Sequence, residues 1–338
     1  MLKIDSSLML NPSRVGSMAA ELEQVGFDGA YTFEGQGDPF IGVAAAAMTT
    51  ERMDLMTSIA VGFARNPMSL AYLGTDLQDL SGGRFILGLG TQVKAHVERR
   101  FSMPWSRPAA RMRELVLATQ AIWSSWKTGE RLNFVGDFYQ HTLMSPTFSP
   151  DMTELDAPPI FLAGVGPKMT EVAGEVGDGF FVHPFHTADS LQRLSIPALH
   201  RGFAAAGKNA AAIDRYVISA QAITATGLNE EELTAAVASA RHQIAFYAST
   251  PAYLPVLEVH GLEGMQTEAN ALMKSGKWEA LGELVSDDIL HRFALVGEPA
   301  DVARQLHTRF DGVVDRVSPV IYAPRTELLA VLLGEIRS

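Results

Sequence analysis

The sequence contains no cysteine among its 338 residues. This absence excludes disulfide bonds, thiolate metal ligands and catalysis by a thiol nucleophile. The sequence also lacks an apolar run long enough to cross a bilayer, and its opening segment, MLKIDSSLML, is too short and too polar to form a signal peptide. We therefore expect a cytoplasmic protein that has no membrane partner.

Positive charge is scarce as well. Lysine and arginine together number 27, against 38 aspartates and glutamates, which gives a formal net charge of −11. Binding to a phosphate backbone requires a basic face, so this balance argues against a nucleic-acid partner. It does not exclude a small anionic ligand, because a few local donors can hold a phosphate against an acidic average. Apolar residues make up 47% of the chain and charged residues 19%, which predicts a large core rather than disorder.

What the sequence does contain is a regular alternation of strand-like and helical segments. The expected strands are residues 2–10, 29–34, 54–62, 84–90, 159–163, 179–183, 216–226 and 316–322. Helical patterns stand between them, at about residues 12–25, 41–49, 68–80, 108–128, 167–176, 188–206, 230–284 and 300–310. Each parallel return needs a crossover helix, so the alternation predicts a parallel sheet.

Eight such units close into a barrel more readily than they form an open sheet. We expect the α/β class and a (β/α)8 TIM barrel with insertions, while periodicity alone leaves a doubly wound open sheet as the alternative. Residues 1–338 form a single domain in this interpretation, with insertions at about residues 130–157 and 230–284. We find no internal repeat and no low-complexity linker.

The clearest candidate site follows the fifth expected strand. Gly164, Val165, Gly166, Pro167 and Lys168 stand where that strand passes into a helix. Glycines allow the backbone to approach a ligand, and proline at a helix start removes no needed donor. The free N–H groups and positive dipole at such a helix start suit a phosphate. The alternative is a plain tight turn followed by a good helix start.

Two further candidates lie at strand ends. Gly88-Leu89-Gly90-Thr91-Gln92 lacks the third glycine of a dinucleotide fingerprint and is not on the first strand, so its small residues could equally ease barrel packing. His183 and His186 follow the sixth strand, and His96 follows the fourth. Barrel enzymes place catalytic groups at these ends, although a lone histidine is more often structural. No third ligand at suitable spacing supports a metal site at the histidine pair.

Five segments, taken in order, make the sequence similar to a known family. They are ELEQVGFDGAYTFE (21–34), RNPMSLAYLGTDLQDLSGGRFILGLG (65–90), PPIFLAGVGPKMTEVAGEVGDGF (158–180), YASTPAYLPVLEVHG (247–261) and LVGEPADVARQL (295–306). Together they resemble the luciferase-like monooxygenase superfamily, and especially its branch that uses the deazaflavin coenzyme F420. The resemblance covers nearly the whole chain and implies a TIM barrel.

The resemblance also implies a cofactor site. Relatives seat the phosphate-bearing tail of the coenzyme on the loop that corresponds to residues 164–168. The pair that matches Thr91 and Gln92 contacts the flat ring. The end of the third strand, Ala60-Val61-Gly62-Phe63, is expected to press against the back of the ring, with a cis peptide bond between Ala60 and Val61. An ordinary trans strand is the alternative. Glu34 matches an acidic residue that bonds the coenzyme.

Two positions depart from the family pattern. Sugar-phosphate dehydrogenases of the family carry a catalytic histidine where this chain has Gly35, and a glutamate where it has Val93. Both acid/base groups of that reaction are therefore missing, which argues against a sugar-phosphate substrate and leaves the acid/base group open. We rank His183 first and His96 second as replacements. Trp105, Tyr247 and Tyr253 are candidates to line the substrate pocket, with core packing as the alternative.

These observations lead to one main functional hypothesis. The chain is expected to be a coenzyme F420-dependent oxidoreductase that exchanges hydride with a small organic substrate, without a metal. An FMN-dependent monooxygenase on the same scaffold is the alternative. A non-catalytic ligand-binding barrel is the hypothesis from another class. Relatives commonly form dimers, so a homodimer is also expected.

Overall fold

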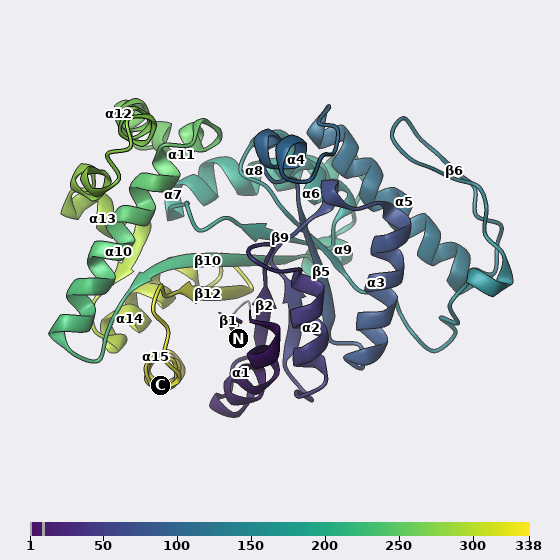
Figure 1. The fold of residues 1–338 in the computed structure, drawn as a ribbon, viewed down its shortest axis with the longest axis horizontal. Helices are drawn as coiled ribbons and strands as arrows, with labels where there is room; N and C mark the ends of the chain where they lie inside the picture. Colours follow the sequence, from purple (N-terminus) through teal and green to yellow (C-terminus); the bar gives the residue numbers. More distant parts are fainter. Residues whose placement is uncertain (1, 9–10) are drawn as a thin grey trace.

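The computed structural model describes residues 2–8 and 11–338 and forms a closed barrel (Figure 1). The barrel strands are β1 (Lys3–Ser7), β2 (Gly29–Thr32), β3 (Asp54–Thr57), β5 (Phe85–Gly90), β8 (Ile160–Ala163), β9 (Gly179–Val182), β10 (Val217–Ala225) and β12 (Arg316–Val320). Each pairs in parallel with the next, and β12 pairs with β1 to close the ring. The expected (β/α)8 barrel is confirmed and the open-sheet alternative is excluded. Residues 9 and 10, which the expected first strand included, lie outside the described residues.

Helices surround this ring. Those that follow barrel strands on the outside are α1 (Pro12–Val25), α2 (Pro39–Ala47), α3 (Pro67–Leu80), α5 (Pro108–Thr128), α6 (Pro167–Val176), α8 (Ile196–Ala205), α14 (Pro299–Phe310) and α15 (Thr326–Arg337). Shorter or inserted helices are α4 (Lys94–Arg99), α7 (Ala188–Ser190), α9 (Ala210–Asp214), α10 (Glu230–Ala248), α11 (Leu254–Glu258), α12 (Glu263–Lys274) and α13 (Asp287–Phe293). In the described part of the chain, no helix combines the length and apolarity that a membrane crossing requires.

The helix starts follow from the local sequence. Asn11, Asp38 and Asn66 each accept a hydrogen bond from a backbone N–H of the first turn of α1, α2 and α3. Proline follows each of these caps, where its missing N–H costs nothing. Gly26 ends α1 at a φ of 107°, a conformation that favours glycine. These signals explain why the helix positions were predictable.

The interior of the barrel is filled by large side chains. Tyr31, Met56, Ile86, Phe161 and Phe181 form one buried cluster inside the ring. Gly88 is required by this packing, because a Cβ atom there would lie 1.7 Å from the carbonyl oxygen of Thr57 and 2.6 Å from the Phe181 ring. For this glycine, the packing interpretation of the GLG segment is therefore correct.

A buried ion pair lies at the seam between β1 and β12. The Arg316 guanidinium donates to both carboxylate oxygens of Asp5, at 2.8 and 2.6 Å, and to Asp54 at 2.6 Å. The Arg316 and Asp5 side chains are only 4% and 1% exposed. Burial alone would lower the pKa of Arg316, but the two carboxylates raise it above its usual value. Charges this deeply buried remain stable only because each has its partner.

Several elements differ from expectation. The third strand divides into β3 and the short β4 (Ala60–Val61), separated by Ser58 and Ile59. Residues 130–157 form the hairpin β6 (Phe134–Val135) and β7 (Gln140–His141) and reach away from the barrel (Figure 1). Residues 230–284 are largely helical, as expected. The sequence analysis missed α13, the edge strand β11 (Ala294–Val296) and α15, which packs against α1 and α14.

We predict that Arg316→Met strongly destabilises the fold. The change leaves the Asp5 carboxylate buried without a partner, which costs about 3–5 kcal/mol in the free energy of unfolding. Arg201→Met is the matched control, because Arg201 pairs with Glu171 at 3.4 Å and its side chain is 53% exposed. The free energy of unfolding of Arg201→Met should fall by less than about 1 kcal/mol. Urea unfolding of the two variants measures the difference, and equal losses would contradict the importance of the seam.

Candidate active site

The predicted site residues come together at one end of the barrel. Residues 33–35, 58–63, 91–93, 164–168 and 183 each follow the carboxyl end of a different strand. Because all eight strands run parallel, these ends form one rim. The rim is the upper side of the barrel in Figure 1, where α4 and α6 leave it. Catalytic groups of TIM-barrel enzymes gather on this face.

The loop after β8 exposes backbone donors. In the described residues, no protein acceptor is bonded to the backbone N–H groups of Val165, Gly166 or Lys168. The Gly166 carbonyl instead accepts hydrogen bonds from the amides of Met169 and Thr170, which starts α6. A Cβ atom built at Gly166 meets nothing within 4 Å, so the space beside it is open. Together with the positive end of the ten-residue helix α6, this loop is able to bind an anion.

The cis peptide bond expected at the end of the third strand was placed two residues too far along the chain. The cis peptide bond joins Ser58 to Ile59, so the expected position between Ala60 and Val61 was wrong. Ala60, Val61 and Phe63 are fully buried. Gly62 begins a short 3-10 turn, and a Cβ atom there would lie 2.9 Å from Leu115. That residues 60–63 contact a cofactor stays a prediction.

Ile59 is the residue at this strand end that the sequence analysis missed. A Cβ atom at Gly90 would lie 2.9 Å from Cδ1 of Ile59, so the isoleucine covers the glycine at the end of β5. Ile59 is partly buried against the barrel interior cluster. Beside it, the Gln221 amide donates to the Ser58 hydroxyl at 3.1 Å. Since β3 and β10 stand opposite each other in the ring, this bond spans the barrel beneath the rim.

Thr91 and Gln92 use their side chains locally. The Thr91 hydroxyl donates to the Gln92 carbonyl at 2.9 Å, and the Gln92 side-chain oxygen accepts from the Val93 amide at 3.0 Å. Gln92 has a φ of 60°, in the left-handed region that is uncommon for a residue with a side chain. Such backbone conformations cluster at functional sites. Their contact with a ring stays a prediction.

Glu34 is held by protein partners. Its carboxylate accepts from Arg65 at 2.6 Å and from the Val61 amide at 2.9 Å, and its side chain is 7% exposed. Arg65 also pairs with Asp38 at 2.8 Å. Burial lowers the pKa of Arg65, but the two carboxylates more than offset this and raise it. Glu34 thus links the end of β2 to the end of β4 through hydrogen bonds. That it also bonds a coenzyme stays a prediction.

His183 lies at the end of β9 with both ring nitrogens occupied by the protein. Nδ1 accepts a hydrogen bond from the Phe185 amide at 3.1 Å, and Nε2 lies 3.1 Å from the Tyr253 hydroxyl. The Tyr253 ring lies 4.6 Å from the imidazole, and the Tyr247 ring meets it edge-on at 4.8 Å. Burial lowers the pKa of His183 to about 3, with a smaller contribution from His186. The ring is therefore neutral at physiological pH.

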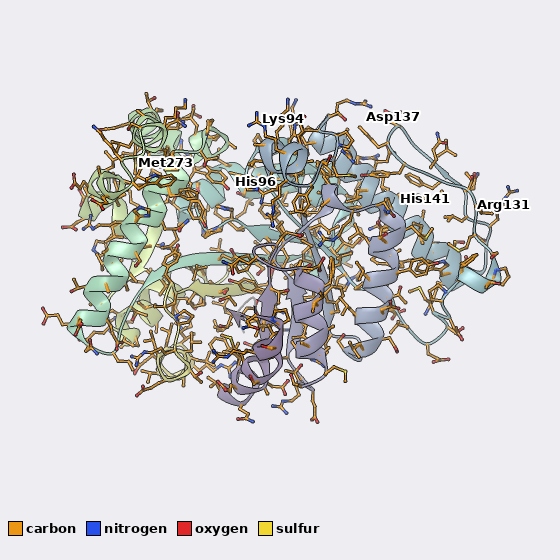
Figure 2. The ribbon with its side chains drawn as sticks, viewed as in Figure 1. Lys94, His96, Arg131, Asp137, His141 and Met273 are labelled. Carbon is orange, nitrogen blue, oxygen red and sulfur yellow. The ribbon has the colours of Figure 1, made fainter. Side chains whose placement is uncertain are left out.

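The other two histidine candidates have different surroundings. His186 is buried, its Nδ1 lies 3.0 Å from the His183 carbonyl, and burial lowers its pKa to about 4. His96 is exposed on α4; in Figure 2 it lies on the side of that helix that faces the strands, with Lys94 at the outer edge. Within residues 2–8 and 11–338, no group of three or more acidic or histidine side chains could hold a metal ion.

Four tyrosines surround the rim, of which Tyr31 and Tyr322 were not predicted. Tyr31 lies on β2, Tyr322 follows β12, and Tyr247 and Tyr253 come from the inserted helical segment. The Tyr247 ring meets the Tyr253 ring edge-on, with ring centres 5.9 Å apart. Burial raises the pKa of Tyr31 to about 12. No periodic pattern in the sequence joins these four positions.

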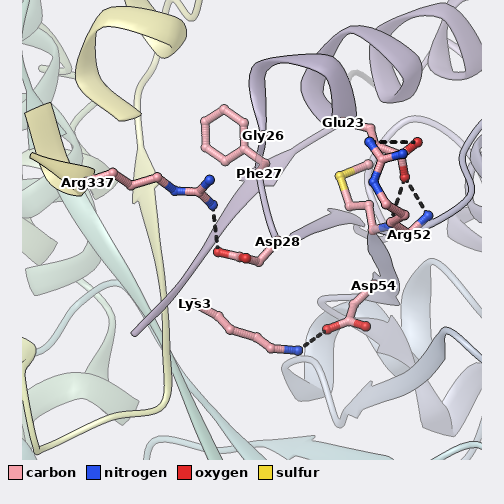
Figure 3. Close-up of a pocket in the computed structure, with 9 residues that line it drawn as sticks. Lys3, Glu23, Gly26, Phe27, Asp28, Arg52, Asp54 and Arg337 are labelled. Carbon is pink, nitrogen blue, oxygen red and sulfur yellow. Dashed lines mark hydrogen bonds and ion pairs between the residues drawn. The ribbon is translucent and has the colours of Figure 1, made fainter. Parts of the chain in front are cut away.

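A cavity of about 330 Å³ lies at the opposite end of the barrel (Figure 3). Charged residues line it, but they pair with one another: Lys3 with Asp54, Arg337 with Asp28, and Arg52 with Glu23. Glu23 lies in the last turn of α1, and the others precede or begin strands β1, β2 and β3, or end α15. In a TIM barrel this face serves stability rather than chemistry, so we do not assign the active site to it.

The fold and the rim define the class of protein: a (β/α)8 barrel with unbonded amides at the start of α6 and aromatic groups at the carboxyl ends of the strands. The chain belongs to the luciferase-like monooxygenase family, whose sequence model matches residues 4–316. The resemblance inferred from five sequence segments is thereby confirmed.

Individual relatives agree with this assignment. The chain is 46% identical over 336 residues to an uncharacterized protein of Mycobacterium tuberculosis, covering 99% of this chain and 98% of the relative. It is 27% identical over 309 residues to a putative coenzyme F420-dependent oxidoreductase of the same species, covering 87% of each. The fold matches the coenzyme F420-dependent tetrahydromethanopterin reductase of Methanopyrus kandleri with a TM-score of 0.78, at 20% identity over 99% and 97% of the chains.

We predict that His183 makes stability fall in acid. The unfolded chain binds a proton at this histidine near its ordinary pKa of 6.5, whereas the folded protein binds it only near 3. Stability is therefore complete above about pH 6.5 and is lost as the pH falls toward 3, by up to about 1.4 kcal/mol per pH unit. In His183→Gln, the free energy of unfolding should depend less steeply on pH between 6 and 4. Urea unfolding across this range measures the slopes, and identical slopes would show that the ring titrates normally.

Proposed function

We propose that this protein is an oxidoreductase that uses coenzyme F420 and exchanges hydride with a small organic substrate at the barrel rim. One observation carries the proposal: the unbonded amides of Val165, Gly166 and Lys168 stand at the start of α6, beside open space. This arrangement suits a phosphate. The putative F420-dependent relative, 27% identical to this chain, supports the choice of the deazaflavin.

The chemical properties of the residues at the rim suit such a cofactor. The loop 164–168 would hold its anionic tail, with Lys168 as an additional positive charge. Ile59 and Gly90 would provide an apolar surface against one face of a flat ring. Bound there, the deazaflavin supplies hydride transfer, and the protein supplies binding, orientation and the exclusion of water.

Two details of the chain bear on the substrate. Gly35 and Val93 stand where sugar-phosphate dehydrogenases of the family are expected to carry their acid/base groups. The Gly35 carbonyl accepts a hydrogen bond from Arg100 at 2.7 Å, so this segment is fixed by α4 and the residues after it. The inserted segment 230–284 brings Tyr247 and Tyr253 to the rim. We infer a small organic substrate that contacts this aromatic side.

An FMN-dependent monooxygenase is the second candidate. The family's name favours it, and the same loop would bind the phosphate of FMN as well as that of F420. A non-catalytic barrel is disfavoured, because named relatives act as oxidoreductases. The homodimer stays a prediction.

We predict that Gly166→Glu weakens cofactor binding without affecting the fold. The backbone at Gly166 has a φ of −85°, and its Cβ atom would enter open space, so glutamate is tolerated sterically. Its carboxylate, however, stands where the anionic tail is expected, and repulsion should weaken F420 binding at least about tenfold. Quenching of tryptophan fluorescence measures the dissociation constants.

Gly264→Glu is the matched control, because Gly264 on α12 also has open space at its Cβ position. It should bind F420 as tightly as the wild type. Tight binding of FMN but not of F420 would overturn the choice of cofactor in favour of the monooxygenase. Unchanged F420 binding by Gly166→Glu would overturn the assigned loop.

A further inference from the structure

Tyr253 is positioned by a short turn in the inserted segment. The 3-10 turn Pro251–Tyr253 joins α10 to α11, and the Tyr253 amide bonds to the Thr250 carbonyl at 3.0 Å. The side chain then lies against His183, at 4.6 Å between ring centres, and against Phe185 at 5.7 Å. A residue 70 positions away in sequence is thus held at the end of β9.

The direction of the hydrogen bond between Tyr253 and His183 follows from the other ring nitrogen. Nδ1 of His183 accepts from the Phe185 amide, so Nδ1 carries no proton. A neutral imidazole carries its one proton on the remaining nitrogen, and Nε2–H therefore donates to the Tyr253 oxygen. The tyrosine keeps its own O–H free to donate. In the described part of the chain, no acceptor is bonded to that O–H.

The side chains that contact Tyr253 in the described part of the chain carry no charge. The Tyr253 hydroxyl lies 3.1 Å from Nε2 of His183, and the two ring centres lie 4.6 Å apart. Aromatic rings of Tyr247 and Phe185 complete the environment. Burial raises the pKa of Tyr253, so the hydroxyl remains protonated at neutral pH. A carboxylate or phosphate placed here would lose its hydration without gaining a counter-charge, which is costly.

We propose that Tyr253 donates its hydroxyl hydrogen bond, and then its proton, to the oxygen of a neutral aldehyde or ketone substrate, and that His183 positions it. This inference rests on the proposed function and names its substrate class. A deazaflavin bound in its reduced form would supply the hydride that forms the new bond at the carbonyl carbon and would itself be oxidised, while the C=O π pair moves onto oxygen. That oxygen takes the Tyr253 proton, which gives the alcohol. His183 Nε2–H stabilises the tyrosinate until solvent returns the proton. Oxidation of the alcohol is the reverse.

This assignment changes the role expected of His183. The histidine has no ring nitrogen available to a substrate, so it acts through Tyr253 as a positioning residue. The inserted segment 230–284 thereby completes the site, because it contributes the group that touches the substrate.

The test combines binding, turnover and spectroscopy. F420 affinity is measured first for the wild type, Tyr253→Phe, His183→Ala and His183→Gln. Consumption of reduced F420 is then followed with acetone, cyclohexanone and benzaldehyde as neutral probes, and with pyruvate as the anionic probe. Tyr72→Phe is the matched control, because the Tyr72 hydroxyl donates to Phe148 on the outside of the barrel.

We expect Tyr253→Phe to bind F420 normally and to lose about 100-fold in kcat with the best neutral probe, with little change in KM. His183→Ala should lose part of this rate, and His183→Gln should recover some of it because its amide N–H can still donate to Tyr253. Nitrogen-15 NMR should show His183 as the neutral Nε2–H form, with the Nε2–H resonance shifted in Tyr253→Phe.

Failures separate the two levels of inference. If the wild type does not bind F420, the proposed function is overturned. Normal F420 binding with a Tyr253→Phe rate equal to that of the wild type and of Tyr72→Phe would overturn the role of Tyr253. Turnover of pyruvate in preference to every neutral probe, or of no neutral probe, would overturn the carbonyl class. A proton on Nδ1 of His183 would overturn the direction of the hydrogen bond.

Discussion

The closure of the first strand against the last is the constraint on which the rest of this structure depends. β1 and β12 pair in parallel, with Lys3 opposite Arg316, and the buried Arg316–Asp5 ion pair lies at that seam. The parallel strands all end on the same side, and closure bends that side into one rim. Residues separated by more than two hundred positions in the chain therefore meet there, which no open sheet would achieve for all eight strands.

The two ends of the barrel have different kinds of charge. At the amino-terminal end, Lys3, Asp28 and Arg337 belong to pairs that satisfy one another around a polar cavity. At the carboxyl-terminal rim, the amides of Val165, Gly166 and Lys168 have no protein acceptor in the described structure, and the Tyr253 hydroxyl is neutral. Unsatisfied donors and an uncharged aromatic surface are properties that a redox cofactor and its substrate can use, whereas satisfied ion pairs mainly stabilise the fold.

Burial determines what the histidine at the rim can do. A histidine in water titrates near neutral pH and is a suitable acid or base, but His183 is kept neutral and has both nitrogens bonded to the protein. The sequence analysis ranked it first as a catalytic residue because it follows β9. Among the described residues, the O–H that has no bonded acceptor belongs instead to Tyr253, a residue that was expected only to line the pocket.

The sequence by itself determined the barrel, because capped helix starts at Asn11 and Asn66 and buried apolar strands are local patterns with a fixed period. It also located the loop at Gly166, since glycine and proline mark a strand-to-helix turn wherever they stand. Only the tertiary structure decided that Ile59 packs over Gly90, that Arg65 forms an ion pair with Glu34, and that Tyr253 is hydrogen-bonded to His183. These contacts join residues from separate strands and from the inserted helices. Their distances depend on how the closed ring packs, and local sequence periodicity does not record that packing.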